Sequence, residues 1–388
     1  MVDLRLHGAI DEIPKHEWDS LLGDGPPFLC WDFLQALEQT GCVDPEKGWA
    51  PAHLSLSEGS QLIAVAPAYI KGNSEGEFVF DHSWAEFAYA RLRHRYYPKL
   101  IVAAPFTPAT GPRLLMRPDV DSEQALRALA GGLGRIIEEN DLSSAHVLFA
   151  EVRQAEALER AGLLLRQGVQ YHWHNPGYAN FEDFLSRYSS KRRNQIRRER
   201  RELEVQGVEL DVKLGSDLSN AEIDHVFEFY AATVDKYFWG RRYLNRNFFQ
   251  EICSRIGSQI LVVLARDKSN PVPLAGAFNL LGPHKLYGRY WGAREERKFL
   301  HFNVCYYRGI EECIARGLKG FEPGAGGEHK LARGFEPVIT YSAHKLKHPT
   351  LHAAIREFLT RERKAVREEI SGATPLLKPL GDVSNDDS

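Results

Sequence analysis

One segment near the carboxyl end of the chain, Phe321–Phe335, follows neither a helical nor a strand-like pattern. Its four glycines permit positive φ angles and a close approach of the backbone to a ligand. The ionisable side chains in it are Glu322, Glu328, His329, Lys330 and Arg333. Because the segment follows a short strand-like run, Lys319–Glu322, it is placed where α/β proteins tend to bind ligands. We interpret it as the functional site; the alternative is a long surface connection with solvated charges.

The length and composition indicate two globular domains. A chain of 388 residues is longer than a single hydrophobic core usually supports. Its composition, with 43% hydrophobic and 26% charged residues, is typical of a folded protein. No apolar run approaches the roughly 20 residues that span a bilayer, and the amino terminus lacks the pattern of a signal peptide. We therefore expect a cytoplasmic protein. The net charge of −3 gives no overall attraction to nucleic acid, so any polyanion site has to be local.

The five cysteines are odd in number and lack Cys-x-x-Cys spacing. This pattern favours buried thiols over disulfides or zinc ligands. We predict no structural metal and no tightly bound cofactor.

Alternating patterns predict a mixed, mainly antiparallel sheet in each half of the chain. In the first half, Trp49–Leu56 and Gln61–Lys71 flank a turn and predict a hairpin. In the second half, three extended runs between Ser258 and Trp291 predict a meander, followed by a helix from about Phe299 to Arg316. We expect domains at 1–174 and 175–372 and a disordered tail at 373–388.

A strongly basic run, 187–207, is predicted to form a helical arm at the start of the second domain. Glu199 is the one acidic residue between Arg187 and Arg201, and apolar residues such as Ile196 and Leu203 are sparse, so we expect an exposed helix. Clustered arginines bind phosphate through planar paired donors. The alternative is a solvated helix face whose arginines pair with carboxylates elsewhere.

The segment Phe321–His344 resembles the signature of the FemAB-like "peptidoglycan biosynthesis/recognition" proteins, predicted N-acyltransferases related to the GNAT enzymes. It reads Phe-Glu-Pro-Gly-Ala-Gly-Gly-Glu-His-Lys-Leu-Ala-Arg-Gly-Phe-Glu-Pro-Val-Ile-Thr-Tyr-Ser-Ala-His. The resemblance extends to Pro27–Arg113, Ser190–Gly240 and Tyr287–Gly309. It implies an α/β (α+β) fold of two GNAT-like domains in tandem, with mixed, mainly antiparallel sheets flanked by helices.

The same resemblance implies transfer of an acyl or aminoacyl group to an amine-bearing acceptor, such as a peptidoglycan precursor. The co-substrate would be an acyl-CoA or an aminoacyl-tRNA, so tRNA is a possible partner. The donor's phosphates are assigned to Arg192, Arg193, Arg197, Arg294 and Lys298. The glycine-spaced pyrophosphate loop of GNAT enzymes is not visible in Ala293–Lys298, which counts against acetyl-CoA itself.

Direct acyl transfer needs a base for the ammonium proton, a donor that polarises the carbonyl and an acid for the leaving group. We assign the base to Glu328 or His329, the carbonyl or anion contact to Lys330, and the acid to Tyr290. An ion pair or a supporting role is the alternative for each. We interpret His301 as a structural histidine.

The acceptor is assigned to residues from both domains around a shared cavity. Carboxylates would bind its amine and aromatic rings would stack on it, the alternative for the first-domain residues being strand-end charges over a packed tryptophan. The assigned residues are Glu77, Asp81, Trp84, Arg289, Trp291 and Arg333.

Three positions depart from the family pattern, and each carries a group that cannot transfer a proton. Asn73 replaces a histidine, Asn303 a glutamate and Gly326 a glutamine. These departures support a second interpretation, a recognition protein for cell-wall or aminoacyl ligands without turnover. A third interpretation is an RNA-binding protein that uses the basic arm.

Overall fold

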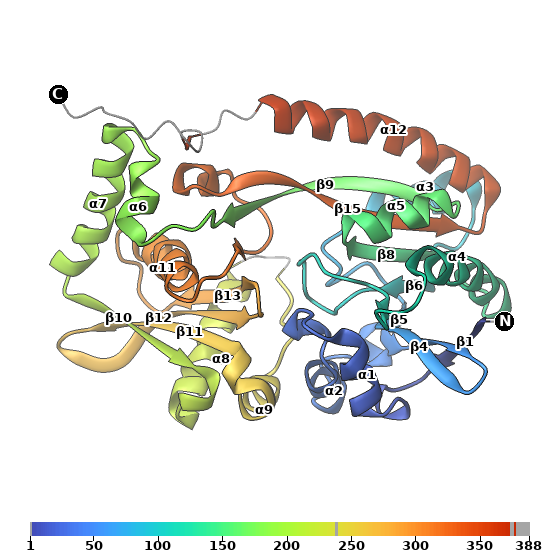
Figure 1. Ribbon diagram of the computed structural model, residues 1–388, viewed down its shortest axis with the longest axis horizontal. Coiled ribbons are helices and arrows are strands. Elements are labelled where there is room, and N and C mark those ends of the chain that lie inside the picture. Colours follow the sequence, from blue (N-terminus) through green and yellow to red (C-terminus); the bar gives the residue numbers. More distant parts are fainter. Residues whose placement is uncertain (1, 237–239, 373–375, 378–388) are drawn as a thin grey trace. The chain divides into compact units, whose positions relative to one another are not determined.

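The computed structural model describes residues 2–236, 240–372 and 376–377, which form two compact units (Figure 1). Unit 1 contains the described residues up to 169 and those from 339 to 371, and unit 2 contains those from 170 to 338 together with 372 and 376–377. The expected second domain ran without interruption to 372, whereas the chain returns to unit 1 after Val338. The expected tail, apart from 376–377, lies outside the described residues.

Unit 1 contains two sheets, one of four strands in the order β1-β3-β4-β7 and one in the order β15-β8-β6-β5-β2. The predicted hairpin is confirmed as β3 and β4, which pair antiparallel from Leu54 opposite Ala66 to Glu58 opposite Gln61. The strands are β1 (Val2–His7), β2 (Trp49–Pro51), β3 (His53–Glu58), β4 (Gln61–Ala66), β5 (Ala68–Lys71), β6 (Lys99–Val102), β7 (Leu115–Met116), β8 (Ser144–Ala150) and β15 (Glu336–Leu346).

The helices of unit 1 pack on these strands through apolar faces. The side chain of Asp121 caps the amino terminus of α4 by accepting hydrogen bonds from the backbone amides of Glu123 and Gln124. Leucines of α4 lie in one core with residues of β3, β6 and β8, and burial of each contributes roughly 1.5–3 kcal/mol. The helices are α1 (Lys15–Leu22), α2 (Trp31–Gln39), α3 (His82–Leu92), α4 (Ser122–Glu139), α5 (Val152–Arg160) and α12 (Pro349–Gly372).

Unit 2 contains a sheet in the order β10-β11-β12-β13-β14-β9. The predicted meander is confirmed as β11, β12 and β13, and the predicted helix after it as α10, a π-helical turn at Asn303–Tyr307 and α11. The strands are β9 (Leu164–His174), β10 (Val208–Leu214), β11 (Ile260–Asp267), β12 (Asn270–Leu281), β13 (Lys285–Ala293) and β14 (Gly320–Glu322). The helices are α6 (Phe181–Ser186), α7 (Ser190–Val205), α8 (Asn220–Asp235), α9 (Arg246–Ile256), α10 (Leu300–Phe302) and α11 (Arg308–Ala315). Strands β9 and β15 each contribute residues to both units.

The two units share one topological feature. In each, a strand–helix–strand unit forms a parallel pair within an otherwise antiparallel sheet. The parallel pair is β6 with β8 in unit 1, joined through α4, and β13 with β14 in unit 2, joined through the helix at 300–315. The expected fold class, mixed and mainly antiparallel sheets flanked by helices in two units, is thereby confirmed.

In the part of the chain that the structure describes, no helix combines the length and the apolar character needed to cross a bilayer.

Candidate functional site

The glycine-rich segment follows β14 and continues into a short 3₁₀ helix, Glu328–Arg333. Its glycines adopt the left-handed conformations that the sequence led us to expect, with φ of 88° at Gly324, 70° at Gly326, 94° at Gly327 and 83° at Gly334. At Gly334 a Cβ atom would lie 2.5 Å from the Tyr188 hydroxyl oxygen, so only glycine fits there. The backbone of this segment therefore depends on its glycines.

Lys330 points inward from the 3₁₀ helix and is 3% exposed. Its Nζ donates to the carbonyl oxygens of Gly324 at 2.7 Å and Ala325 at 3.3 Å. Among the described residues no carboxylate forms an ion pair with it, and burial lowers its pKa to about 8. An ammonium group has three donors, so these two contacts leave one N–H of Lys330 without a hydrogen-bond partner among the described residues.

His329, next to Lys330, is exposed and its Nε2 lies 2.8 Å from the hydroxyl oxygen of Tyr306. Burial of part of the ring, with the positive charges of Arg333 and Lys330, lowers the pKa of His329. The imidazole is therefore neutral at pH 7 and able to accept a proton.

The ring of His301 lies near that of His329 and in turn contacts Trp291. His301 lies with its centroid 5.8 Å from that of His329, and Trp291 lies 4.3 Å from His301. Burial and the neighbouring His329, Arg333 and Lys330 lower the pKa of His301 to about 4, so this ring is also neutral. His301 was expected to be structural, and the structure places it beside the candidate base.

Arg333 anchors the end of the 3₁₀ helix. Its Nη2 donates to Oε2 of Glu199 at 3.1 Å, its Nη1 donates to the carbonyl of His329 at 2.8 Å, and its guanidinium lies 3.2 Å from the ring centroid of Phe302. The predicted role of Arg333 in substrate binding stays a prediction. The observed contacts hold the loop against α7.

Glu199 itself was not among the predicted site residues. It is 2% exposed and accepts from the hydroxyl of Tyr307 and from Nε2 of Gln195 at 3.0 Å, in addition to Arg333. Ile196, Glu199 and Leu203 are buried at positions i, i+3 and i+7 of α7, so the helix has a buried face that the sequence analysis did not expect. The sequence did contain a hint of this face, because Glu199 lies on the same side of the helix as Ile196 and Leu203.

Asn303, one of the departures from the family pattern, lies at the start of the π-helical turn. Its Nδ2 donates to the carbonyl of Glu199 at 3.1 Å and to that of Phe299 at 2.9 Å. π-helical turns are frequent at functional sites, because they move one residue out of helical register. Here the turn brings Tyr306 to His329 and Tyr307 to Glu199.

The predicted residues of β13 point to different neighbours. Trp291 stacks near His301, whereas the ring of Tyr290 packs against Tyr230 at 5.0 Å and Phe249 at 5.9 Å. Nη2 of Arg289 donates to the Tyr290 hydroxyl at 3.4 Å. The structure brings Trp291 beside His301. The acid role of Tyr290 and the substrate role of Arg289 stay predictions.

The other candidate base, Glu328, begins the 3₁₀ helix, but its side chain lies outside the part of the chain that the structure describes. Its role stays a prediction.

Three of the predicted phosphate-binding residues have no carboxylate partner among the described residues. Arg192 donates to Oε1 of Gln195 at 2.9 Å, Arg193 donates to the carbonyl of Tyr188 at 3.0 Å, and Nζ of Lys298 lies 5.3 Å from the ring centroid of Phe299. The other two are paired: Arg197 with Glu182 at 2.6 Å, and Arg294 with Glu228.

In unit 1, Glu77 and Asp81 are buried and bind an ammonium group of the chain itself. Nζ of Lys99 donates to Glu77 at 2.8 Å and to Asp81 at 2.6 Å. Burial raises the pKa of Glu77 to about 7, whereas Lys99 holds the pKa of Asp81 below its usual range although burial acts in the opposite direction. The role of both residues in acceptor binding stays a prediction.

Trp84 is buried beside this cluster, with its ring 4.9 Å from that of His344 and the Arg166 guanidinium 5.1 Å above it. Asn73 accepts from Nζ of Lys71 at 3.2 Å. Both side chains thus contact other residues of unit 1, although the buried indole N–H of Trp84 has no hydrogen-bond partner among the described residues.

No group of three or more histidine, cysteine, aspartate or glutamate side chains within the described ranges is arranged to hold a metal ion.

Two solved structures share the fold of this chain over most of its length. FemX is 12% identical, with a TM-score of 0.54 over 89% of this chain and 98% of its own. The C-terminal domain of a candidate lysylphosphatidylglycerol synthetase from Agrobacterium fabrum is 10% identical, with a TM-score of 0.53 over 93% of this chain and 98% of its own. At such identities the similarity shows a shared fold. No curated protein sequence is similar enough to count as a relative.

The sequence also matches the profile of one protein family over residues 9–377, which is nearly its whole length. The match includes the glycine-rich segment, the basic helix α7 and the π-helical turn described above. The chain therefore belongs to the FemAB-like family, which is described as peptidoglycan biosynthesis/recognition.

Proposed function

We propose that this protein is an N-acyltransferase that moves an acyl or aminoacyl group onto an amine-bearing acceptor, such as a peptidoglycan precursor. The observation that carries the proposal is Lys330, a buried cation without a carboxylate partner among the described residues and with one donor left. Membership of the FemAB-like family supports the same reaction class.

In the proposed reaction, the acceptor nitrogen attacks the donor carbonyl carbon. A C–N bond forms as the C–S bond of a thioester or the C–O bond of an ester breaks. Lys330 donates its remaining N–H to the carbonyl oxygen, where negative charge develops. Two carbonyl contacts fix the ammonium in place before the reaction begins.

His329 is the proposed base, because its ring is neutral and exposed. It takes the proton that the acceptor amine loses, and the hydrogen bond to Tyr306 orients the imidazole. The leaving sulfur or oxygen takes its proton from solvent or from Tyr290, the acid assigned from the sequence. His301 lies beside this base, and Trp291 packs against His301.

The proposed donor carries phosphate groups, as a coenzyme A thioester or an aminoacyl-tRNA does. Arg192 and Arg193 on α7 support this, because neither is neutralised by a carboxylate of the described chain. α7 also holds the Lys330 segment through Glu199 and Arg333. Donor binding and catalysis would therefore both depend on α7, where Arg192 and Glu199, seven residues apart, lie on one side of the helix.

The test is a transfer assay with the purified protein, an amine-bearing peptidoglycan precursor and either an acyl-CoA or an aminoacyl-tRNA, with products identified by mass spectrometry. We expect an acceptor whose mass is increased by one acyl or aminoacyl group. Binding of the acceptor without product from either donor would instead support the recognition protein, which Asn303 favours because its amide is used in packing.

A further inference from the structure

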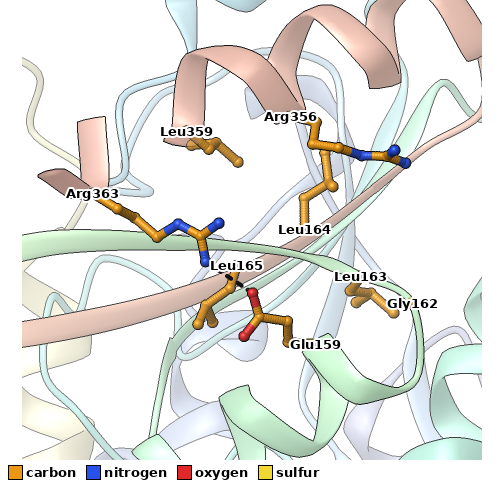
Figure 2. Close-up of a pocket in the computed structure, with 8 residues that line it drawn as sticks. All are labelled: Glu159, Gly162, Leu163, Leu164, Leu165, Arg356, Leu359 and Arg363. Carbon is orange, nitrogen blue, oxygen red and sulfur yellow. Dashed lines mark hydrogen bonds and ion pairs between the residues drawn. The ribbon is translucent and has the colours of Figure 1, made fainter. Parts of the chain in front are cut away.

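A hollow of about 270 Å³ lies in unit 1 between α12 and the turn that joins α5 to β9 (Figure 2). We call it the α12 groove. No residue of the proposed transfer reaction lines it. Its lining residues are Glu159, Gly162, Leu163, Leu164, Leu165, Arg356, Leu359 and Arg363.

The floor of the α12 groove is apolar. Leu164 is half-buried and keeps apolar surface exposed in the groove, whereas the other lining leucines, Leu163, Leu165 and Leu359, are only 3%, 5% and 1% exposed. Gly162 turns the chain here with φ of 96°, and no atom lies within 4 Å of the position its Cβ would take. The groove thus offers leucine side chains and open space to an apolar ligand group.

The rim of the α12 groove is cationic. Arg363 reaches Glu159 across the groove at 2.8 Å, as Figure 2 shows, whereas Arg356 forms no ion pair with any described residue. Two further cations of α12 are paired, Arg361 with Glu357 at 3.6 Å and Lys364 with Glu368 at 3.7 Å.

A second hollow of about 460 Å³ adjoins the first and shares Arg363 with it. It contributes Arg367, which also forms no ion pair within the described chain. Arg356, Arg363 and Arg367 are spaced by seven and four residues, so they lie on one side of the helix. The two hollows together have an excess of two positive charges. Their four cations are Arg356, Arg363, Lys364 and Arg367, and their two carboxylates are Glu159 and Glu368.

We propose that the α12 groove is a binding site for a single-chain amphiphile with an anionic head, a carboxylate or a phosphate ester. The apolar chain lies on the leucines and the head lies among the guanidinium groups. The volume is just below the roughly 300–1,000 Å³ of pockets for drug-sized ligands, so it fits one short chain. The charge excess selects an anion, and the leucine floor selects a chain over a simple inorganic ion.

The proposal is tested by calorimetric titration of the full-length protein with decanoate and decyl phosphate below their micelle concentrations. We expect saturable binding of at least one of them, and the tighter one identifies the head group. Acetate and inorganic phosphate lack the chain and should bind at least about tenfold more weakly, since a buried CH₂ contributes about 0.8 kcal/mol. Equal binding of these small anions would contradict the leucine contact.

Matched variants locate the site. Arg356→Glu and Arg367→Glu should each weaken binding about tenfold, the loss expected for one charge-assisted contact. Arg361→Glu makes the same charge change away from the groove and should leave the affinity within about twofold. Leu164→Asn tests the apolar floor, with circular dichroism as the control for folding.

Three outcomes would overturn the proposal: equal loss of affinity in Arg361→Glu and Arg356→Glu, equally tight binding of decyltrimethylammonium, or binding to vesicles of anionic phospholipid without binding to either decyl probe. The last result would indicate a membrane-contacting surface instead of a ligand site. The proposal does not depend on acyl transfer, so a failed transfer assay leaves it standing.

Discussion

Arg333 and Glu199, 134 positions apart in sequence, form a buried ion pair in which Nη2 lies 3.1 Å from Oε2. The pair joins the glycine-rich segment to the basic helix α7. Because Lys330 lies in the same 3₁₀ helix as Arg333, the position of the proposed oxyanion donor depends on a carboxylate of the arginine-rich arm.

Replacing Glu199 should destabilise the protein. Glu199→Ala leaves Arg333 buried without its partner, and breaking a buried pair in this way costs about 3–5 kcal/mol of unfolding free energy. Urea denaturation measures the loss. Glu204→Ala, an exposed position on the same helix, should change stability by less than about 0.5 kcal/mol. Similar losses in both variants would show that the ion pair does not hold the segment.

Removing the ammonium of Lys330 should abolish transfer without unfolding the protein. Lys330→Met keeps most of the side-chain volume but donates no hydrogen bond, and loss of one oxyanion donor lowers kcat by about 10²–10³-fold. Steady-state kinetics measure the loss. Lys268→Met, which loses a surface lysine paired with Glu209, is the matched control. Full activity of Lys330→Met would remove Lys330 from the reaction.

Transfer should decline at alkaline pH. Burial lowers the pKa of Lys330 to about 8, so the charged donor is present below that pH and is lost as pH rises through it. A pH profile of kcat should therefore fall above about pH 8. Arginine stays charged throughout, so whatever activity Lys330→Arg retains should lack this alkaline limb. An unchanged limb would assign it to another group.

Acid should destabilise the protein partly through His172. Burial lowers its pKa from 6.5 to about 4, although Glu322 acts in the opposite direction, so the unfolded chain takes up a proton in this window before the folded chain does. Stability contributed by neutral His172 is present above pH 6.5 and is lost as pH falls toward 4, by about 3 kcal/mol. Urea denaturation of His172→Gln should show a smaller loss between these two pH values than the unmodified protein. Equal losses would exclude His172 as a source.

Donor binding should depend on salt through α7. In a double variant, Arg192→Gln with Arg193→Gln, the KM for the donor should rise while kcat is kept, because only phosphate contacts are removed. The dependence of log KM on log salt should become shallower by roughly two phosphate contacts, each worth about 0.7–0.9 in slope. Arg255→Gln, on α9, is the control. An unchanged slope would place the donor's phosphates elsewhere.

Much of the candidate site could be predicted from local sequence. Glycines at 324, 326, 327 and 334 predicted a segment with positive φ, and all four adopt it. The predicted contact of Lys330 with an anion or a substrate carbonyl stays a prediction; the structure shows a buried ammonium that donates to two carbonyls of the same segment. Such features are encoded within a few residues, because backbone freedom and side-chain type are local properties.

The partners of that segment could not be predicted. Glu199 was visible as a lone acid among arginines, but nothing in the sequence indicated that it faces Arg333. Likewise, His301 and Tyr306 reach His329 only because the helix contains a π-helical turn, which changes the direction of the side chains that follow it.

The amino-acid sequence by itself determined the alternation of strands and helices, the glycine-dependent bend and the cationic character of α7, since these follow from residue type and spacing. The tertiary structure decided which charges meet. Glu77 and Asp81 bind Lys99, and Glu199 binds Arg333. Ion pairs between distant residues depend on burial and on which faces pack together, because a buried charge is stable only where the fold brings it a partner.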